Sequence, residues 1–344
     1  MTATATSTRA ASPPAAAPAL LRRFGPFLFV LALAAVTYAL IGPQQFVNAL
    51  TIGAIYALVA LGYTMVYGII ELINFAHGDI FMVGAFVSLF FLGQQLGQTG
   101  PVTELPVLAL LLVAAFTLTM LVMGLIGVII ERFAYRPLRN APKLAPLITA
   151  IGLSFILQNI VQSIYGPSPI NTPQLISPVA RFDLLGASIG YINLFVIVVA
   201  VSLMVGLQLF VNRTKLGRAM RSTAQDREAA QLMGVDINRT IAATFFIGSA
   251  LAGAAGVVQG LYFGNIQFTL GFQAGLKAFT AAVLGGIGNI TGAALGGFVI
   301  GFVEVTAAAR GQFIWAQALV FAVLILVLVF RPTGLLGQQL GERA

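Results

Sequence analysis

The chain has 344 residues, of which 59% are hydrophobic and 8% are charged, and its net charge is +8. Its mean hydropathy of +0.97 excludes a water-soluble globular protein, because too few polar side chains remain to cover a surface. Lipid must therefore be the main solvent, and we predict an all-α fold of the polytopic helical membrane class.

Several kinds of chemistry are also excluded. The sequence has no cysteine and one histidine, His77, so disulfides, thiolate nucleophiles and paired-histidine zinc sites have no basis. The Gly-x-x-x-x-Gly-Lys-[Ser/Thr] phosphate cradle is missing as well. We therefore predict no catalytic residue, no metal site and no cofactor in this chain, and any ATP and Mg²⁺ would be bound by a partner.

The chain opens with an Ala/Thr/Pro/Ser-rich stretch, residues 1–24, which we predict to be a disordered cytoplasmic tail. Arg22 and Arg23 precede the first apolar run, as they would in a signal peptide. Because no convincing small-residue cleavage site follows, we expect an uncleaved first helix with its N-terminus inside.

Residues 25–337 form the predicted transmembrane domain, and residues 338–344 a short cytoplasmic tail. Apolar runs suited to membrane spans lie at 27–41, 46–66, 80–92, 105–130, 144–165, 191–211, 240–263 and 313–330. The stretch 275–305 is too long for one span and is interrupted at "GGIGNITG", so we expect two shorter segments there. The total is then about ten helices, with about eight as the lower bound.

Glycines at helix-packing spacing surround this interruption. Removing side chains lets helices approach closely in lipid, and a broken, Gly-rich helix also suits the lining of a transport path. The glycines that we assign to the break and to packing are Gly285, Gly286, Gly288, Gly292 and Gly296.

Basic residues gather in the loops on one side of the predicted spans. The loop 131–143 carries Arg132, Arg136, Arg139 and Lys143, and the loop 212–239 carries a still larger group. The positive-inside rule places both loops and both chain termini in the cytoplasm. The net positive charge thus marks the cytoplasmic side, and we predict no nucleic-acid partner.

Polar residues at or near membrane depth occur in "ELINFAHGDIFMVGAF", which contains Asn74, His77 and Asp79. No nucleophile lies near His77 at a spacing that catalysis would use. We favour a structural role, in which Asp79 is the N-cap or a first-turn acid of the next helix at the cytoplasmic side. Direct contact with a solute is the alternative.

The densest polar segment is "STAQDREAAQLMGVDINRT", residues 222–240. Ser222 or Thr223 fits the start of a capping box and Gly234 fits a C-terminal stop, which predicts a helix of about ten residues. Ala229, Leu232 and Met233 form an apolar strip that is too narrow to cross a membrane. Such a helix is suited to docking in a protein groove. A helix lying on anionic lipid is the alternative.

Four long motifs resemble the permease subunits of ABC importers for branched-chain amino acids, of the type without a long C-terminal extension. The motifs are "INFAHGD", "GRAMRSTAQDREAAQLMGVDINRTIAATFFIGSALAGAAG", "GLKAFTAAVLGGIGNITGAALGG" and "RPTGLLG". The resemblance extends over residues 46–337. It implies a type II importer-like fold and a location in the bacterial inner membrane.

The resemblance also implies partners: a second permease subunit in a heterodimer, two cytoplasmic ATP-binding subunits and an extracytoplasmic solute-binding protein. That protein would deliver leucine, isoleucine or valine. In ABC importers a Glu-Ala-Ala-x-x-x-Gly segment forms the coupling helix that seats in the ATPase, although the Ile-x-Leu-Pro that follows it in the family is absent here. The implied coupling residues are Asp226, Glu228, Ala229, Ala230, Leu232, Met233 and Gly234.

Other functions remain open from the sequence. Permeases for urea and short-chain amides carry similar motifs, and an ATP-independent secondary transporter or channel would also use Gly-rich broken helices, although Glu304 is the one acid that we expect deep in a span. A membrane-embedded enzyme would need a cluster of catalytic groups, which is missing from the sequence. Polar residues expected along a path are Asn74, Gln158, Asn159, Gln267, Thr280 and Asn289.

Overall fold

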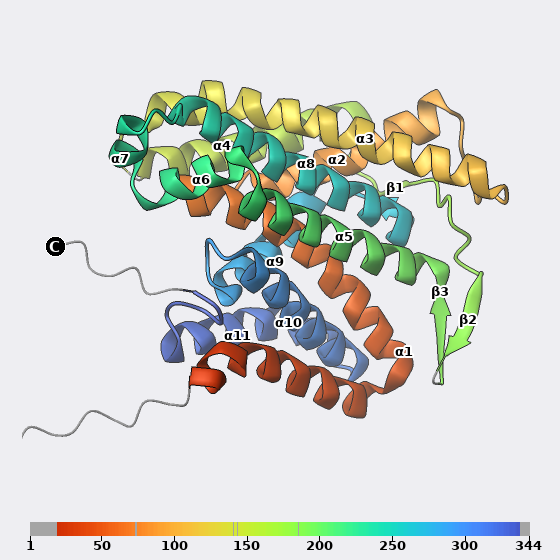
Figure 1. The fold of residues 1–344 in the computed structure, drawn as a ribbon. Helices are drawn as coiled ribbons and strands as arrows, with labels where there is room; N and C mark the ends of the chain where they lie inside the picture. The colour runs from red at the N-terminus through yellow and green to blue at the C-terminus, as the bar shows by residue number, and fades with distance from the viewer. Residues whose placement is uncertain (1–18, 73, 140, 143, 185, 338–344) are drawn as a thin grey trace, which may run out of the picture.

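The computed structural model describes residues 19–72, 74–139, 141–142, 144–184 and 186–337, and they form a helical bundle (Figure 1). Its helices are α1 (Ala19–Ile70), α2 (His77–Leu89), α3 (Leu105–Ile130), α4 (Leu144–Tyr165), α5 (Tyr191–Arg213), α6 (Lys215–Gln225), α7 (Arg227–Leu232), α8 (Ile237–Phe263), α9 (Leu270–Gly285), α10 (Ile290–Ala309) and α11 (Ala316–Phe330). A π-helix, Phe90–Gln95, extends α2.

Four short strands lie at one end of the bundle. Strands β1 (Ile170–Asn171) and β4 (Asn265–Ile266) pair antiparallel, as do β2 (Arg181–Leu184) and β3 (Ala187–Gly190). The first pair ties the loop after α4 to the end of α8. These strands are too short to carry a periodic sequence pattern, and they were not predicted.

The predicted membrane spans are confirmed as helices. Among the described residues, eight helices are long and apolar enough to cross a membrane. Helix α1 contains a kink at Gly42, whose φ of 76° is not helical, so it comprises two arms. Helix α9, with 16 residues, is shorter than a full span. Every apolar segment predicted from the sequence therefore corresponds to a helix or to one arm of a helix.

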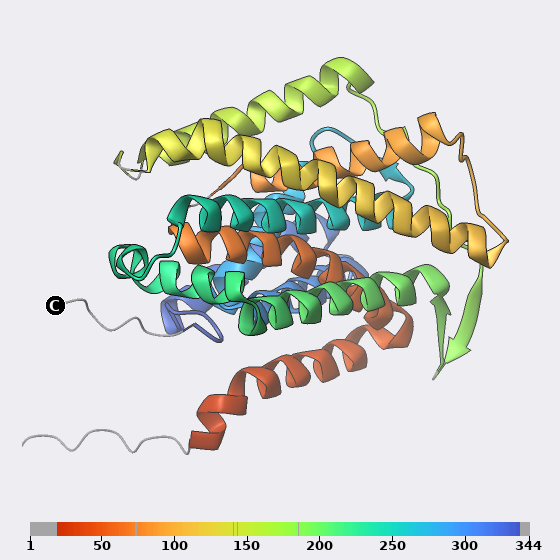
Figure 2. The same ribbon diagram turned by 45° about the horizontal axis from the view of Figure 1, so that its top comes forward.

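The predicted tails fall mostly outside the described residues, which start at 19 and end at 337. Helix α1 begins at Ala19, inside the last part of the predicted N-terminal tail. Figure 2 shows the first arm of α1 along one edge of the bundle, with α4 along the opposite edge.

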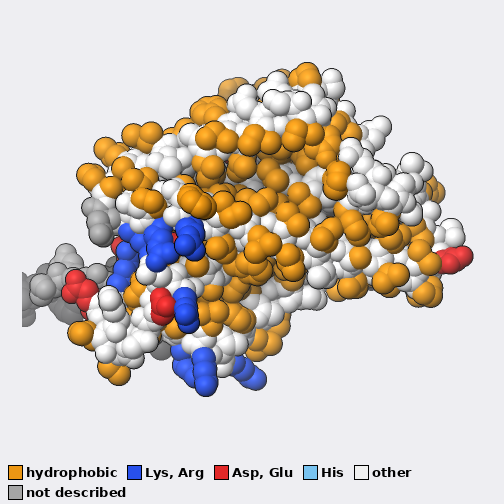
Figure 3. All heavy atoms as spheres, turned by 90° about the horizontal axis from the view of Figure 1, so that it is seen from above, with side chains coloured by type: hydrophobic (Ala, Val, Ile, Leu, Met, Phe, Trp, Pro, Cys, Tyr) orange, Lys and Arg blue, Asp and Glu red, His pale blue; other side chains and the backbone are white. Residues whose placement is uncertain are grey.

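Inner and outer helices differ sharply in burial. In α8, 78% of the most apolar window is buried, against 17% in α3 and in α11. Outer helices turn large apolar side chains outward, such as Leu110 with 69% and Phe330 with 78% of its surface exposed. The wide apolar face in Figure 3 follows from this arrangement. Such a surface is suited to lipid, whereas α2, α8, α10 and the second arm of α1 make the core.

Two helices, α2 and α9, of 13 and 16 residues, start inside the bundle and meet at their first turns. An added Cβ at Gly78 of α2 would lie 2.3 Å from the carbonyl oxygen of Gly271 and 2.7 Å from the Cα of Gly275, both on α9. The backbones therefore touch, and any side chain at Gly78 would separate them.

The segments of chain that lead into α2 and α9 are similar in sequence and conformation. The preceding helix ends at a residue with positive φ, Glu71 at 55° and Gly264 at 70°. The sequences from these residues on are "ELINFAHG" and "GNIQFTLG". Both have Ile at the third position, an amide residue at the fourth, Phe at the fifth and Gly at the eighth. Glu71 shares a hollow with the start of α7, whereas Gly264 directly precedes β4 and accepts from the N–H of Thr172. Figure 1 shows α7 and the strands at opposite ends of the bundle. The chain thus turns back into the bundle once from each end.

The predicted position of Asp79 was partly wrong. Asp79 does lie in the first turn of α2, but Ala76 is the N-cap and the helix begins in the interior. His77 and Asp79 both have no exposed surface. His77 packs where Gly62 leaves room, since a Cβ at Gly62 would lie 2.2 Å from its Nε2. Asp79 is therefore a buried acid at the interior start of α2, in addition to Glu304, which the sequence already places deep in a span.

The two basic loops lie together at one end of the bundle. Arg139 Nη1 donates to Asn238 Oδ1 at 2.6 Å, which joins the loop after α3 to the start of α8. Figure 3 shows Lys and Arg side chains gathered at the end that carries α6 and α7. This common placement is what the positive-inside argument requires. That this end faces the cytoplasm stays a prediction.

We predict that Gly78→Ala lowers the stability of the bundle by about 1–3 kcal/mol, because the new methyl group must push α2 away from α9. The measurement is the thermal unfolding midpoint of the purified protein in detergent. Gly206→Ala in α5 is the matched control, since nothing lies within 4 Å of the added Cβ. An equal midpoint for both variants would contradict the tight crossing.

Candidate functional site

The basic end of the bundle carries two consecutive short helices, each capped by a side chain at its start. Thr214 Oγ1 accepts from the backbone N–H of Gly217 at 2.9 Å and begins α6. Asp226 Oδ1 accepts from the N–H of Ala229 at 3.0 Å and begins α7. Asp236 Oδ1 accepts from the N–H of Arg239 at 3.0 Å and begins α8. Carboxylates and hydroxyls at these positions fix where each helix starts.

The short helix starts later than the sequence analysis predicted. The expected capping box at Ser222 or Thr223 is wrong, because both residues lie inside α6. Their hydroxyls donate to the carbonyl oxygens of Arg218 and Ala219, at 2.7 and 2.8 Å. Side chains engaged one turn back are not available to cap a new helix. Helix α7 therefore has six residues, not about ten.

Helix α7 turns its apolar side chains outward. Leu232 is 89% exposed and Met233 is 84% exposed, and Ala229 and Glu228 also lie on the open side. Among its apolar side chains, that of Ala230 faces the bundle, with 4% of its surface exposed. Gly234 ends the helix with a φ of 83°, a conformation that favours glycine. Exposed Leu and Met side chains at the polar end of a membrane protein indicate a surface that another molecule covers.

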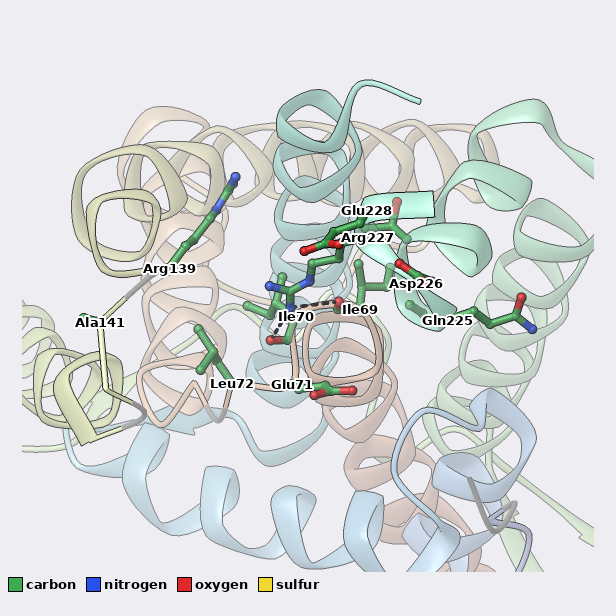
Figure 4. Close-up of a pocket in the computed structure, with 12 residues that line it drawn as sticks. Ile69, Ile70, Glu71, Leu72, Arg139, Ala141, Gln225, Asp226, Arg227 and Glu228 are labelled. Atoms are coloured by element: carbon green, nitrogen blue, oxygen red, sulfur yellow. Dashed lines mark hydrogen bonds between the residues drawn. The ribbon is translucent and has the colours of Figure 1, made fainter. Parts of the chain in front are cut away.

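Arg227 fastens α7 to the end of α1. Its Nη2 donates to the carbonyl oxygen of Ile70 at 2.7 Å and lies 3.5 Å from that of Ile69 (Figure 4). The last carbonyls of a helix lack intrahelical partners and carry partial negative charge, so a guanidinium is a strong partner for them. Sequence reasoning missed this role, because residues 227 and 70 are remote in the chain.

Two hollows flank this attachment. One, of about 530 Å³, lies between the end of α1 and the start of α7, where Glu71, Asp226 and Arg227 line it. The other, of about 430 Å³, lies between α7 and the start of α8. Arg139 lines both. Figure 4 shows side chains of both signs around the first hollow, so α7 stands as a ridge between two polar depressions.

Arg139 is itself held by an ion pair with the buried carboxylate of Glu131. Burial lowers the pKa of the Arg139 guanidinium, and the charge of Glu131 opposes that shift. A guanidinium remains charged at any physiological pH. The pair thus fixes a positive charge beside α7.

The six path candidates lie apart from one another. Gln158 Nε2 donates to Asp79 Oδ1 at 2.9 Å, and Asn74 Oδ1 accepts from Tyr135 Oη at 2.9 Å. Asn159 and Thr280 donate to carbonyl oxygens one turn back in their own helices, those of Phe155 and Leu276. Gln267 donates to the carbonyl oxygen of Pro167 in the loop after α4, and Asn289 donates to that of Leu336 and accepts from the N–H of Gly292. Six scattered groups do not make one site.

The glycines assigned to the break lie around residues 286–289, between α9 and α10. Gly286 and Gly288 have φ of 101° and 88°, and Gly288 faces Gly68 of α1. A Cβ at Gly285 would lie 2.0 Å from the carbonyl oxygen of Gly292, and one at Gly296 would lie 2.0 Å from that of Ala281. The backbones of α9 and α10 are thus in contact on either side of the break, between the end of α9 and the start of α10.

One ion pair between helices α9 and α10 was not predicted from the sequence, although Glu304 was expected deep in a span. Lys277 Nζ lies 2.6 Å from Glu304 Oε1. Within the described residues, no group of three or more His, Asp or Glu side chains is placed to hold a metal ion.

Comparison with known proteins gives one consistent result. The family model described as "Branched-chain amino acid transport system / permease component" matches residues 45–328. The chain is 45% identical to the high-affinity branched-chain amino acid transport system permease protein BraD of Pseudomonas aeruginosa, over 87% of this chain and 97% of the relative. It is 43% identical to LivH of Escherichia coli K12, a permease with the same description, over the same shares.

More distant relatives match less of the sequence. The probable branched-chain amino acid transport permease protein LivH of Methanocaldococcus jannaschii is 29% identical over 81% of this chain and 88% of its own length. No solved structure matches the chain.

We predict that Arg227→Met loosens α7 without unfolding the bundle. Hydrogen bonds from a charged donor contribute about 1.5–3 kcal/mol, so backbone exchange in α7 should speed up by about tenfold or more. Hydrogen-exchange mass spectrometry of residues 227–235 measures this. Arg239→Met is the control, because the Arg239 side chain is 89% exposed and its ion pair with Asp236 lies at the surface. Unchanged exchange in Arg227→Met would show that α7 is held by other contacts.

Proposed function

The chain belongs to the family of permease components of branched-chain amino acid transport systems, and we propose that it is the membrane-spanning subunit of an ATP-driven importer. Its substrates are the branched-chain amino acids leucine, isoleucine and valine, as the names of its relatives suggest. In this proposal the chain lines the translocation path, and its helix α7 transmits movement from the ATPase subunits to the membrane spans. Two cytoplasmic partner subunits bind ATP and Mg²⁺, a second permease subunit completes the membrane part, and an extracytoplasmic protein delivers the solute.

The observation that carries this proposal is the exposed apolar face of α7. The apolar side chains of Leu232 and Met233 are almost fully exposed, which is unfavourable in water. The end of the bundle that carries them is rich in Lys and Arg side chains (Figure 3). A groove in a partner protein would cover them, with Glu228 and Asp226 at the rim. The attachment through Arg227 supports the same conclusion, because a helix that transmits force must be fixed to the spans.

The cycle that we propose follows from these attachments. Closure of the ATPase subunits on ATP moves α7, and Arg227 carries the movement to the end of α1. The segment after Ile70 leads into α2, and its Asn74 accepts a hydrogen bond from Tyr135, in the π-helix Glu131–Tyr135 that continues α3. Movement at α7 thereby reaches the interior crossing of α2 and α9. Of the six path candidates, Asn74 has a buried Nδ2 with no hydrogen-bond partner among the described residues, so we retain it first as a solute contact.

An ATP-independent transporter is the second candidate, and one observation favours it. Asp79 is an interior carboxylate that a coupled proton or cation would use, with Gln158 as its hydrogen-bond partner. Uptake of labelled leucine into liposomes decides between them. We expect uptake to require internal ATP, the ATPase subunits and the binding protein. Uptake driven by an ion gradient alone would overturn the importer. Urea in place of leucine tests the amide alternative.

We predict that Leu232→Asp lowers both transport and the ATP hydrolysis stimulated by the binding protein by at least about tenfold. An exposed apolar anchor that fills a partner's pocket carries much of the binding energy, and a carboxylate there would be desolvated without a partner. Within this chain the same residue touches little, so the amount of protein in the membrane should not change. Glu228→Arg should act in the same direction through charge reversal at the rim.

Arg132→Gln is the control for these variants, since it removes an exposed charge from the neighbouring loop. Stimulated ATP hydrolysis and uptake are measured in the complete reconstituted transporter. Normal coupling in both Leu232→Asp and Glu228→Arg would contradict docking through α7.

A further inference from the structure

A charged pair lies within the membrane-spanning part of the bundle, where three helices meet. Lys277 on α9 pairs with Glu304 on α10, with 2.6 Å between Nζ and Oε1. Lys277 Nζ also donates to the hydroxyl of Tyr56, on the second arm of α1, at 3.2 Å. The same ammonium lies 5.5 Å from the centre of the Tyr56 ring.

The pair lies at membrane depth, far from the basic end. Helix α10 begins at that end with Ile290, and at 1.5 Å per residue Glu304 lies about 21 Å further along. The hydrocarbon core of a bilayer is about 30 Å thick. Charges at this depth are costly, and they are found facing a protein interior or a water-filled path.

The pair is accessible from outside the chain, unlike Asp79. The Lys277 side chain is 16% exposed and that of Glu304 is 20% exposed, whereas Asp79 has no exposed surface. Gln273, one turn earlier on α9, is exposed as well. Exposing an ammonium, a carboxylate and an amide to lipid is energetically costly. This side of α9 must therefore face something polar.

Both members of the pair keep unused capacity for hydrogen bonds. Glu304 Oε2 is itself buried and has no hydrogen-bond partner among the described residues, although the Tyr56 hydroxyl also lies against this carboxylate. The Lys277 ammonium has three N–H donors, of which the bonds to Glu304 and Tyr56 use two. The terminal torsion of a glutamate is broad, so Oε2 can turn towards the open side. One acceptor and one donor of opposite charge are thus available a short distance apart.

We propose that Lys277 and Glu304 form a transient binding site for the two charged groups of a zwitterionic amino acid on its way through the membrane. The inference rests on the proposed function. The carboxylate of the solute takes the free N–H of Lys277, and its ammonium binds Glu304 Oε2. Each charge then keeps an opposite partner throughout, so the passage leaves no unpaired charge in a low-dielectric region. An uncharged solute such as urea gains nothing from this exchange.

The test uses the complete transporter in liposomes and the paired variant Lys277→Met with Glu304→Gln. Removing one charge would leave the other unpaired and destabilise the bundle, whereas removing both is close to neutral for folding. We expect normal assembly, and ATP hydrolysis stimulated by leucine-loaded binding protein within about twofold of the wild type, because α7 is unchanged. We expect the number of leucine molecules imported per ATP to fall at least about tenfold.

Two further variants separate solute contact from structural support. Lys277→Glu with Glu304→Lys keeps the internal pair and reverses its polarity, so import per ATP should stay low. Thr306→Val on the same helix removes a hydroxyl that has no partner among the described residues, and it should transport normally. Full transport by the reversed pair would assign the charges to structure alone and overturn the proposal.

The other outcomes are equally informative. Import per ATP within about twofold of the wild type in the neutral pair would overturn the proposal. Loss of the second permease subunit from both paired variants would assign these residues to the subunit contact and also overturn it. If the wild-type transporter itself fails to import leucine with ATP, the proposed function fails, and that result is distinct from any change between variants.

Discussion

The contact between α2 and α9 at Gly78 and Gly271 is the constraint on which the rest of the bundle depends. Both helices begin in the interior, so the chain reaches them through backbone that is not regular helix, at residues 71, 72 and 74–76 and at residues 264–269. In lipid such backbone is tolerated only when protein surrounds it. The enclosing helices α8 and α10 each approach α1 closely, at Gly248 against Gly62 and at Gly301 against Gly53. The outer helices then shield this core from lipid, with large apolar side chains turned outward.

The sequence predicted the spans and the break near Gly286 because apolar length and glycine spacing are local properties. It also identified Gly234 as the stop of the short helix, since a glycine with positive φ just after a helix is a local signal. It failed where a polar residue finds its partner elsewhere in the chain. Asp79 meets Gln158, and Arg227 meets Ile70. No periodicity distinguishes a polar residue at the surface from one that is satisfied inside, so the interior start of α2 was missed.

The attachments at the basic end favour transmission by a rigid element. Helix α7 is short, is capped at its start and ends at a glycine with positive φ. The connections from α6 and to α8 are therefore short and have little conformational freedom. Arg227 joins it to the end of α1, which is also where the chain turns back towards α2. A displacement of α7 can therefore bias the interior crossing directly. Close-packed interfaces of this kind favour discrete arrangements over gradual deformation, as an alternating-access cycle needs.

A paired charge suits a transport path better than a single one. A lone lysine or glutamate at membrane depth would need a permanent counter-charge, and it would hold an oppositely charged group tightly enough to slow release. In the pair of Lys277 and Glu304, each charge competes with the solute for the other, which weakens binding while it preserves electrostatic complementarity. Conduction requires binding that is favourable enough to enter and weak enough to leave. Selection among solutes can then rest with the delivering protein, and the membrane subunit need only accept the charges that all α-amino acids share.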